Sequence, residues 1–156
     1  MQVILSIHLQ NASEKPIGTG SLVQQHICRM SETTTYRSGC PLASALDIVG
    51  DKWSLVVLRG FFVGYARYGD FLKAPETIST NILADRLKSL ECVGLIERIP
   101  EASSRARYRL TRKGADLLPV LQELARWGFE NIAERWQPPD WFMKAAPKDF
   151  YPKKAR

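Results

Sequence analysis

Residues 78–96 constrain the fold most, because they contain signals for both ends of one helix. Ser79 is suited to be the N-cap, where its hydroxyl can accept a bond from a backbone N–H of the first turn. Gly94 can adopt the left-handed conformation that ends a helix, and Leu95 can then fold back on the last turn. The sequence therefore predicts a helix from about Thr80 to Val93.

The predicted helix has two faces of different character. At helical periodicity one arc is apolar and consists of Ile82, Leu83, Leu87, Leu90 and Val93. The opposite arc is small or polar and consists of Thr80, Asn81, Ala84 and Lys88. Such a helix can enter a DNA major groove with its first turns, although a merely solvated face gives the same pattern. Arg86 lies inside the apolar arc, and we interpret it as a structural residue that pairs with a carboxylate.

A short basic hairpin is predicted directly after this helix. Residues 95–99 and 106–110 alternate as strands do, and residues 100–105 between them are rich in turn formers. Three arginines fall on one side of the second strand: Arg105, Arg107 and Arg109. A basic loop beside such a helix is suited to phosphates or a narrow minor groove. Helix and hairpin together indicate a winged helix-turn-helix.

The segments upstream supply the other helices of this fold. Asp51 can cap an apolar helix that runs through Phe62. Residues 68–74 form a short helix stopped by Pro75, and residues 75–79 are the turn. The predicted fold class is therefore mainly α with a small β-hairpin wing (α+β), a winged helix-turn-helix that dimerises through its terminal helices.

A long C-terminal helix is predicted from about Arg112 to Arg135, with Thr111 as its N-cap. Pro119 either kinks this helix or marks its true first turn. The helix carries more apolar and aromatic surface than one small domain needs. We expect this surface to form a homodimer interface, which matches the reading of two half-sites; the alternative is a monomer core.

The chain divides into three predicted parts. Residues 1–35 form a leader or arm, and we hypothesise that Met30 is the natural start. Residues 36–136 form the DNA-binding and dimerisation domain, and residues 137–156 form a mobile C-terminal tail. No apolar run is long enough to span a membrane and no secretion signal is evident, so we expect a cytoplasmic protein.

Many spaced residues resemble one family. They are Cys40–Leu42, Ala45–Trp53, Arg67–Phe71, Ile78–Ser79, Leu83, Arg86–Leu90, Gly94–Ile96, Tyr108–Thr111, Gly114 and Leu118–Leu121. This pattern resembles the HxlR family of MarR-like winged-helix transcriptional regulators. The resemblance implies a homodimer on an inverted-repeat operator. It also implies that the cysteine before the first helix can sense oxidants or electrophiles in some members.

Cys40 is the candidate sensor in this chain. It precedes Pro41, so it lies near a helix N-terminus where the dipole favours a thiolate, and Arg37 is close in sequence. The alternative is an inert, half-buried cysteine. Cys92 is most simply a small core residue.

Charge and residue types narrow the function further. The formal net charge of +6 and a pI of about 9.4 favour a polyanionic partner. Beyond the leader there is no histidine to serve as a base, and no metal-ligand spacing or phosphate-binding glycine loop is present. We therefore expect a regulator without enzyme activity, cofactor or metal. Two alternatives remain, a sequence-indifferent architectural DNA binder and a winged-helix protein-interaction module.

The predicted DNA contacts follow from these elements. In the major groove we expect Ser79, Thr80, Asn81, Ala84 and Lys88. At the DNA backbone or minor groove we expect Arg67, Arg105 and Arg107.

Overall fold

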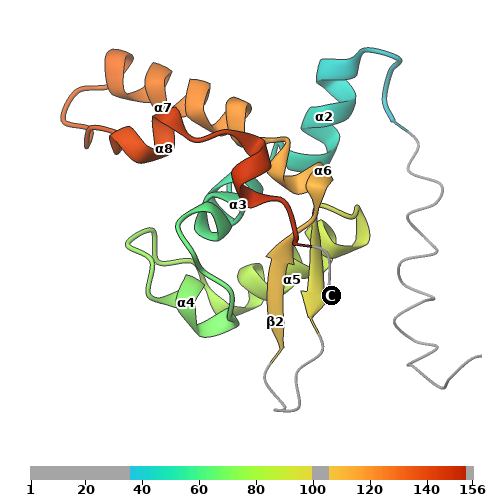
Figure 1. The fold of residues 1–156 in the computed structure, drawn as a ribbon. Coiled ribbons are helices and arrows are strands. Elements are labelled where there is room, and N and C mark those ends of the chain that lie inside the picture. Colours follow the sequence, from blue (N-terminus) through green and yellow to red (C-terminus); the bar gives the residue numbers. More distant parts are fainter. Residues whose placement is uncertain (1–35, 100–105, 154–156) are drawn as a thin grey trace, which may run out of the picture.

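The computed structural model describes residues 36–99 and 106–153. Its elements are α2 (Pro41–Val49), α3 (Ser54–Phe62), α4 (Tyr68–Leu72), α5 (Thr80–Cys92), β1 (Ile96–Ile99), β2 (Arg107–Leu110), α6 (Arg112–Ala115), α7 (Leu118–Asn131), α8 (Asp140–Lys144) and the 3-10 helix η1 (Pro147–Phe150). The hairpin projects from one end of the molecule, and α2 and α7 lie at the other (Figure 1). This mainly helical fold with a two-stranded antiparallel sheet confirms the predicted class, whereas dimerisation through the terminal helices stays a prediction. The predictions for residues 1–35, for Met30 as the start and for Arg105 lie outside the described residues.

The core forms where α3, α5, the hairpin and α7 meet. Its fully buried large side chains include Leu58, Leu83, Leu87, Leu90, Ile96 and Leu118. Each such side chain contributes about 1.5–3 kcal/mol of burial free energy. The predicted apolar arc of α5 is therefore confirmed at its centre. It is wrong at Ile82, which is 39% exposed because it lies at the edge of the arc, beside the outward face.

Both ends of α5 lie close to their predicted positions. Ser79 is the N-cap residue, but its side chain makes no capping bond, which corrects the expected role of its hydroxyl. At the C-terminal end Gly94 has a φ of +70°. The Gly94 N–H donates to the Glu91 carbonyl at 3.0 Å and the Leu95 N–H to the Leu90 carbonyl at 2.9 Å. These two bonds form the Schellman ending that the sequence predicts.

Asp51 connects the start of α3 to α5. The helix begins at Ser54, two residues later than a direct cap at Asp51 predicts. The Asp51 carboxylate instead accepts the backbone N–H groups of Trp53 at 2.8 Å and Ser54 at 3.1 Å, together with the Ser54 hydroxyl. Arg86 Nη1 lies 3.1 Å from Asp51 Oδ2, which confirms Arg86 as a structural, paired residue. Burial opposes the charge, but the Ser54 and Trp53 bonds and Arg86 hold the pKa of Asp51 below its usual value.

The C-terminal helix is divided in two. Thr111 Oγ1 accepts the Gly114 N–H at 3.1 Å and caps α6, as predicted. Pro119 lies in the first turn of α7, which confirms the second of its two predicted roles. A proline here has no N–H to donate and its ring crowds the preceding turn, so one continuous helix cannot form. The helix also ends at Asn131 rather than Arg135.

The prediction of a mobile tail is wrong for the residues that form α8 and η1. Phe142 is buried in the core. Gln122 Nε2 on α7 donates to the carbonyls of Phe142 at 2.7 Å and Ala145 at 3.0 Å. The Phe150 ring meets Phe62 edge-on, with centroids 4.9 Å apart. Buried aromatic side chains and hydrogen bonds to backbone carbonyls therefore hold this segment on the domain. Its proline and lysine content alone predicts a mobile tail.

Candidate nucleic-acid interface

The outward face of α5 is free of intramolecular packing in its first turns. All five residues predicted at the groove have exposed side chains: Ser79, Thr80, Asn81, Ala84 and Lys88. They bring hydroxyl, amide and ammonium groups to one surface, together with the methyl groups of Thr80 and Ala84. These groups can donate to base edges, accept from them and contact a thymine methyl group.

The hairpin is attached to the start of α4, which brings two predicted arginines together. In the hairpin Ile96 pairs with Leu110 and Ile99 with Arg107. On the other edge of β2, Arg107 also forms an antiparallel bridge with Arg67, the residue before α4. Both side chains are exposed. Two exposed arginines forty residues apart in sequence are therefore brought side by side at the start of the helix-turn-helix.

Arg109, the other arginine of β2, has a role within the hairpin. Arg109 Nε lies 2.6 Å from Glu97 Oε1, and the two residues are paired across the strands. This opposite-charge pair supports the hairpin register. Arg109 is therefore less available to a phosphate than the sequence alone indicates.

Asp70 holds the start of α4 in place. Its carboxylate accepts the Arg67 N–H at 2.8 Å and the Ala66 N–H at 3.1 Å. The Arg67 bond first, and then the Ala66 bond, hold the pKa of Asp70 below its usual value. We did not predict this residue, although an acidic residue three positions after the N-cap is a known capping signal.

A half-buried ion pair stabilises the turn between α4 and α5. Arg59 on α3 contacts Glu76 through two bonds, Nη1 to Oε1 at 2.7 Å and Nη2 to Oε2 at 3.0 Å. The Arg59 bond is the main reason that the pKa of Glu76 lies below its usual value. Thr77, the next residue, has a φ of +53°, so the turn is strained where the pair holds it. No local sequence pattern connects these residues, so this ion pair was not predicted.

A side-chain hydrogen bond of Tyr68 connects α4 to the start of α5. Its hydroxyl donates to the Thr80 carbonyl at 2.6 Å. The bond joins the two helices of the helix-turn-helix at Thr80, the first residue of α5. The sequence places Tyr68 on the first helix but does not reveal its partner.

Tyr68→Phe is expected to remove this bond with little change in shape. A net loss of about 0.5–1.5 kcal/mol in the free energy of unfolding follows, because the Thr80 carbonyl keeps its helical partner. Urea denaturation of the two proteins measures the difference. Tyr36→Phe, at an exposed residue outside the helices, is the matched control and is expected to leave stability unchanged. A Tyr68→Phe protein as stable as the parent would show that the bond does not hold α5.

Cys40 occupies the N-cap position of α2, and its side chain is exposed. Pro41 follows in the first turn, as predicted. The expected charge from Arg37 is directed elsewhere, since its Nε lies 2.7 Å from Asp47 Oδ1. Cys92 is half-buried at the end of α5. Arg37 is therefore paired with a carboxylate and not with the Cys40 thiol.

Residues 36–99 and 106–153 contain no group of three or more histidine, cysteine or acidic side chains that could hold a metal ion. No helix in these two segments is long and apolar enough to cross a membrane.

A helix pair with an exposed second helix and a basic hairpin beside it defines a winged helix-turn-helix of the DNA-binding type. The model of the HxlR-like helix-turn-helix family matches residues 48–136. The chain belongs to this family. It is accordingly a transcriptional regulator with a helix-turn-helix DNA-binding fold.

Two relatives agree with this assignment. An uncharacterized HTH-type transcriptional regulator of Synechocystis is 40% identical over 97 residues, which are 61% of this chain and 72% of that protein. One of Mycobacterium tuberculosis is 38% identical over 103 residues, 65% of each chain. The match thus spans just under two thirds of the mycobacterial relative.

Two solved structures share the fold. PA1607, a putative transcription factor, has a TM-score of 0.60 and 31% identity, with 79% of this chain and 94% of that chain covered. The redox regulator HypR in its oxidized form has a TM-score of 0.55 and 28% identity, with 59% of this chain and 97% of that chain covered.

Proposed function

We propose that this protein is a homodimeric repressor that binds an inverted-repeat operator and responds to oxidants or electrophiles through Cys40. The observation that carries the proposal is the exposed face of α5 beside the bridged pair Arg67 and Arg107. A helix face with short polar groups can read bases, and a nearby pair of guanidinium groups can fix the register on phosphates. The protein would act on cytoplasmic DNA.

In the proposed complex, the residues divide by task. Base contacts come from the α5 face, namely Ser79, Thr80, Asn81, Ala84 and Lys88. Backbone or minor-groove contacts come from Arg67, Arg107 and Arg105, the last of which lies outside the described residues. Tyr68 and Asp70 do not contact DNA in this proposal, but they hold the two elements that do.

The proposed dimer uses the end of the molecule away from the hairpin (Figure 1). There α7 exposes a row of apolar side chains, Val120, Leu124 and Trp127, and α2 exposes Leu42 and Leu46. Leu42 is 68% exposed and Trp127 60%. Apolar surface of this extent on two terminal elements favours a second copy as its cover. An inverted-repeat operator is the DNA counterpart of such a two-fold dimer.

The proposed switch follows from the position of Cys40. The thiol is exposed at the N-terminus of α2, the element that carries part of the proposed dimer surface. Oxidation or alkylation there would alter how two subunits meet, and with that the spacing of their two α5 helices. The likeness to HypR, described as a redox regulator, supports this assignment.

Cys40→Ser is expected to make DNA binding insensitive to oxidation. Fluorescence anisotropy at fixed salt compares DNA flanking the protein's own gene with random DNA, before and after mild thiol oxidation. Preferential binding that oxidation weakens by about tenfold in the parent, and not in the variant, is the expected result. Cys92→Ser is the matched control and is expected to stay sensitive.

Other outcomes separate the rival functions. Preferential binding that oxidation does not change would support a sequence-specific regulator and contradict redox sensing by Cys40. Equal binding to both DNAs would favour an architectural DNA binder, and no binding to either would favour a protein-interaction module. Transcription in vitro from a promoter next to the bound site gives the sign of regulation, and a repressor is expected to lower it.

A further inference from the structure

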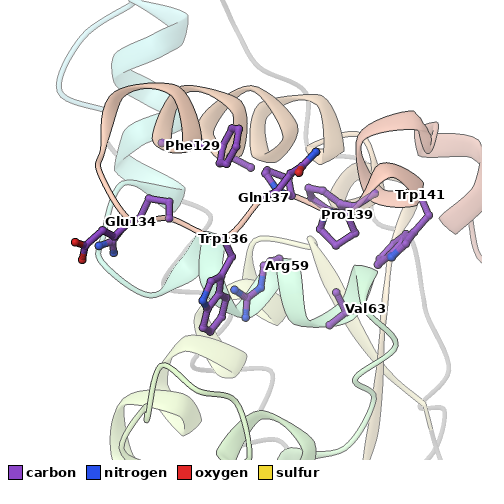
Figure 2. Close-up of a pocket in the computed structure, with 13 residues that line it drawn as sticks. Arg59, Val63, Phe129, Glu134, Trp136, Gln137, Pro139 and Trp141 are labelled. Carbon is purple, nitrogen blue, oxygen red and sulfur yellow. The ribbon is translucent and has the colours of Figure 1, made fainter.

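A hollow of about 580 Å³ lies between α3, α7 and the segment that leads into α8. This volume is in the range of small-molecule pockets, roughly 300–1,000 Å³. Figure 2 shows Phe129, Trp136, Pro139 and Trp141 around it, with Arg59 among them. We propose that this hollow binds a small planar aromatic anion, whose negative group takes Arg59 as its partner in place of Glu76.

The lining sets the chemistry of the ligand. Its walls are mainly aromatic rings and prolines, which favour flat apolar groups. The charged groups at the rim are Arg59, Arg135 and Glu134, so cations exceed anions. A guanidinium group binds a carboxylate or sulfonate with directed, charge-assisted bonds. A planar ring with one negative group therefore complements both the walls and the rim.

Arg59 connects the hollow with the helix-turn-helix. Its guanidinium lines the hollow and at the same time makes both bonds to Glu76 in the turn before α5. The Arg59 side chain keeps 36% of its surface exposed in the ion pair. An anion can therefore approach it without any unfolding of the protein. An anion bound to Arg59 competes with Glu76, and Glu76 then holds the strained turn at Thr77 less firmly.

The far wall of the hollow comes from a segment outside the family match. That match ends at residue 136, whereas the wall includes Gln137, Pro138, Pro139, Trp141 and Phe142. The wall is held in position, because Phe142 is buried and its carbonyl accepts a bond from Gln122 at 2.7 Å. The hollow is therefore formed before any ligand arrives, by a part of the chain that the helix-turn-helix itself does not require.

Calorimetric titration of the full-length protein with 2-naphthoate tests the proposal, and the uncharged 2-naphthamide is the matched control ligand. Naphthoate is expected to bind at least about tenfold more tightly than the amide, which corresponds to one charge-assisted contact. Glu76→Gln is expected to tighten naphthoate binding by about threefold to tenfold, because it removes the competing carboxylate. An unchanged Tm of the Glu76→Gln protein separates this gain from non-specific binding to a loosened fold.

Two tryptophan variants locate the ligand. Trp136→Ala, in the hollow and 82% exposed, is expected to weaken naphthoate binding about tenfold. Trp127→Ala, on the exposed row of α7 and outside the hollow, is expected to leave it unchanged. Equal binding of acid and amide, or no gain with Glu76→Gln, would overturn the proposal. A weaker complex for Trp127→Ala than for Trp136→Ala would also overturn it, because the ligand would then lie at the α7 surface.

The expected effect of the bound anion on DNA binding rests on the proposed function. Ligand binding itself is tested separately, because the titration contains no DNA. Saturating naphthoate is expected to weaken operator binding by about threefold or more, and Glu76→Gln to remove this response. Naphthoate binding to a protein that does not prefer operator DNA would contradict the proposed function alone. Operator binding by a protein that does not bind naphthoate would contradict only the proposal that the hollow binds an aromatic anion.

Discussion

Gly114→Ala is expected to lower the free energy of unfolding by about 3 kcal/mol, as overpacking against a fixed backbone does. A Cβ at this position would lie 1.9 Å from the Leu95 carbonyl oxygen and 3.2 Å from a Leu110 methyl group. The carbonyl cannot yield easily, since it also accepts the Thr111 N–H at 3.1 Å. Because α6 would have to withdraw from the base of the hairpin, the wing would lose its support as well.

Thermal unfolding measures this effect, and a decrease in Tm of about 10 °C is expected for a domain of this size. Gly69→Ala is the matched control, because its Cβ would meet nothing within 4 Å and the residue lies on the short helix α4. Its stability is expected to change by less than about 1 kcal/mol, and upward if at all. A Gly114→Ala protein as stable as the Gly69→Ala protein would show that α6 does not pack closely on Leu95.

Leu124→Glu is expected to convert the proposed dimer into a monomer and to weaken operator binding by about a hundredfold or more. Leu124 is 51% exposed on α7, between Val120 at 45% and Trp127 at 60%. A carboxylate buried there between two subunits would lack a counter-charge. A monomer binds one half-site only, so it loses the gain in effective concentration that the second half-site gives.

Analytical ultracentrifugation gives the mass of this variant and of a control in which an exposed leucine on another helix is also replaced by glutamate. Leu72→Glu is that control, because Leu72 is also an exposed leucine but lies on α4, away from α7. It is expected to keep the mass of a dimer. A Leu124→Glu protein that remains dimeric would place the interface on another surface, and a parent protein that is monomeric would contradict the dimer altogether.

The local features of this fold were predictable because their signals are local. The last turn of α5 needs only a glycine at position 94 and an apolar residue after it. The break at Pro119 follows from the chemistry of proline. Arg86 was assigned a carboxylate partner on the ground that a charge in an apolar arc must be neutralised, and Asp51 is that partner.

The features that escaped prediction depend on pairs distant in sequence. Nothing near Tyr68 points to the Thr80 carbonyl, and nothing near Arg59 points to Glu76. The packing of the tail was missed for the same reason, because the partner of Phe150 is Phe62. The hollow beside Arg59 needs three separate segments at once, so no single stretch of sequence indicates it.

Binding of Asn81→Ala to operator and to random DNA at one fixed salt concentration tests the central claim, that the exposed face of α5 reads base sequence. The variant is expected to lose about 1–3 kcal/mol of binding free energy on the operator and little on random DNA. Arg107→Ala, which removes a proposed backbone contact, is expected to weaken both and to reduce the salt dependence. Equal losses on both DNAs from Asn81→Ala would contradict the claim.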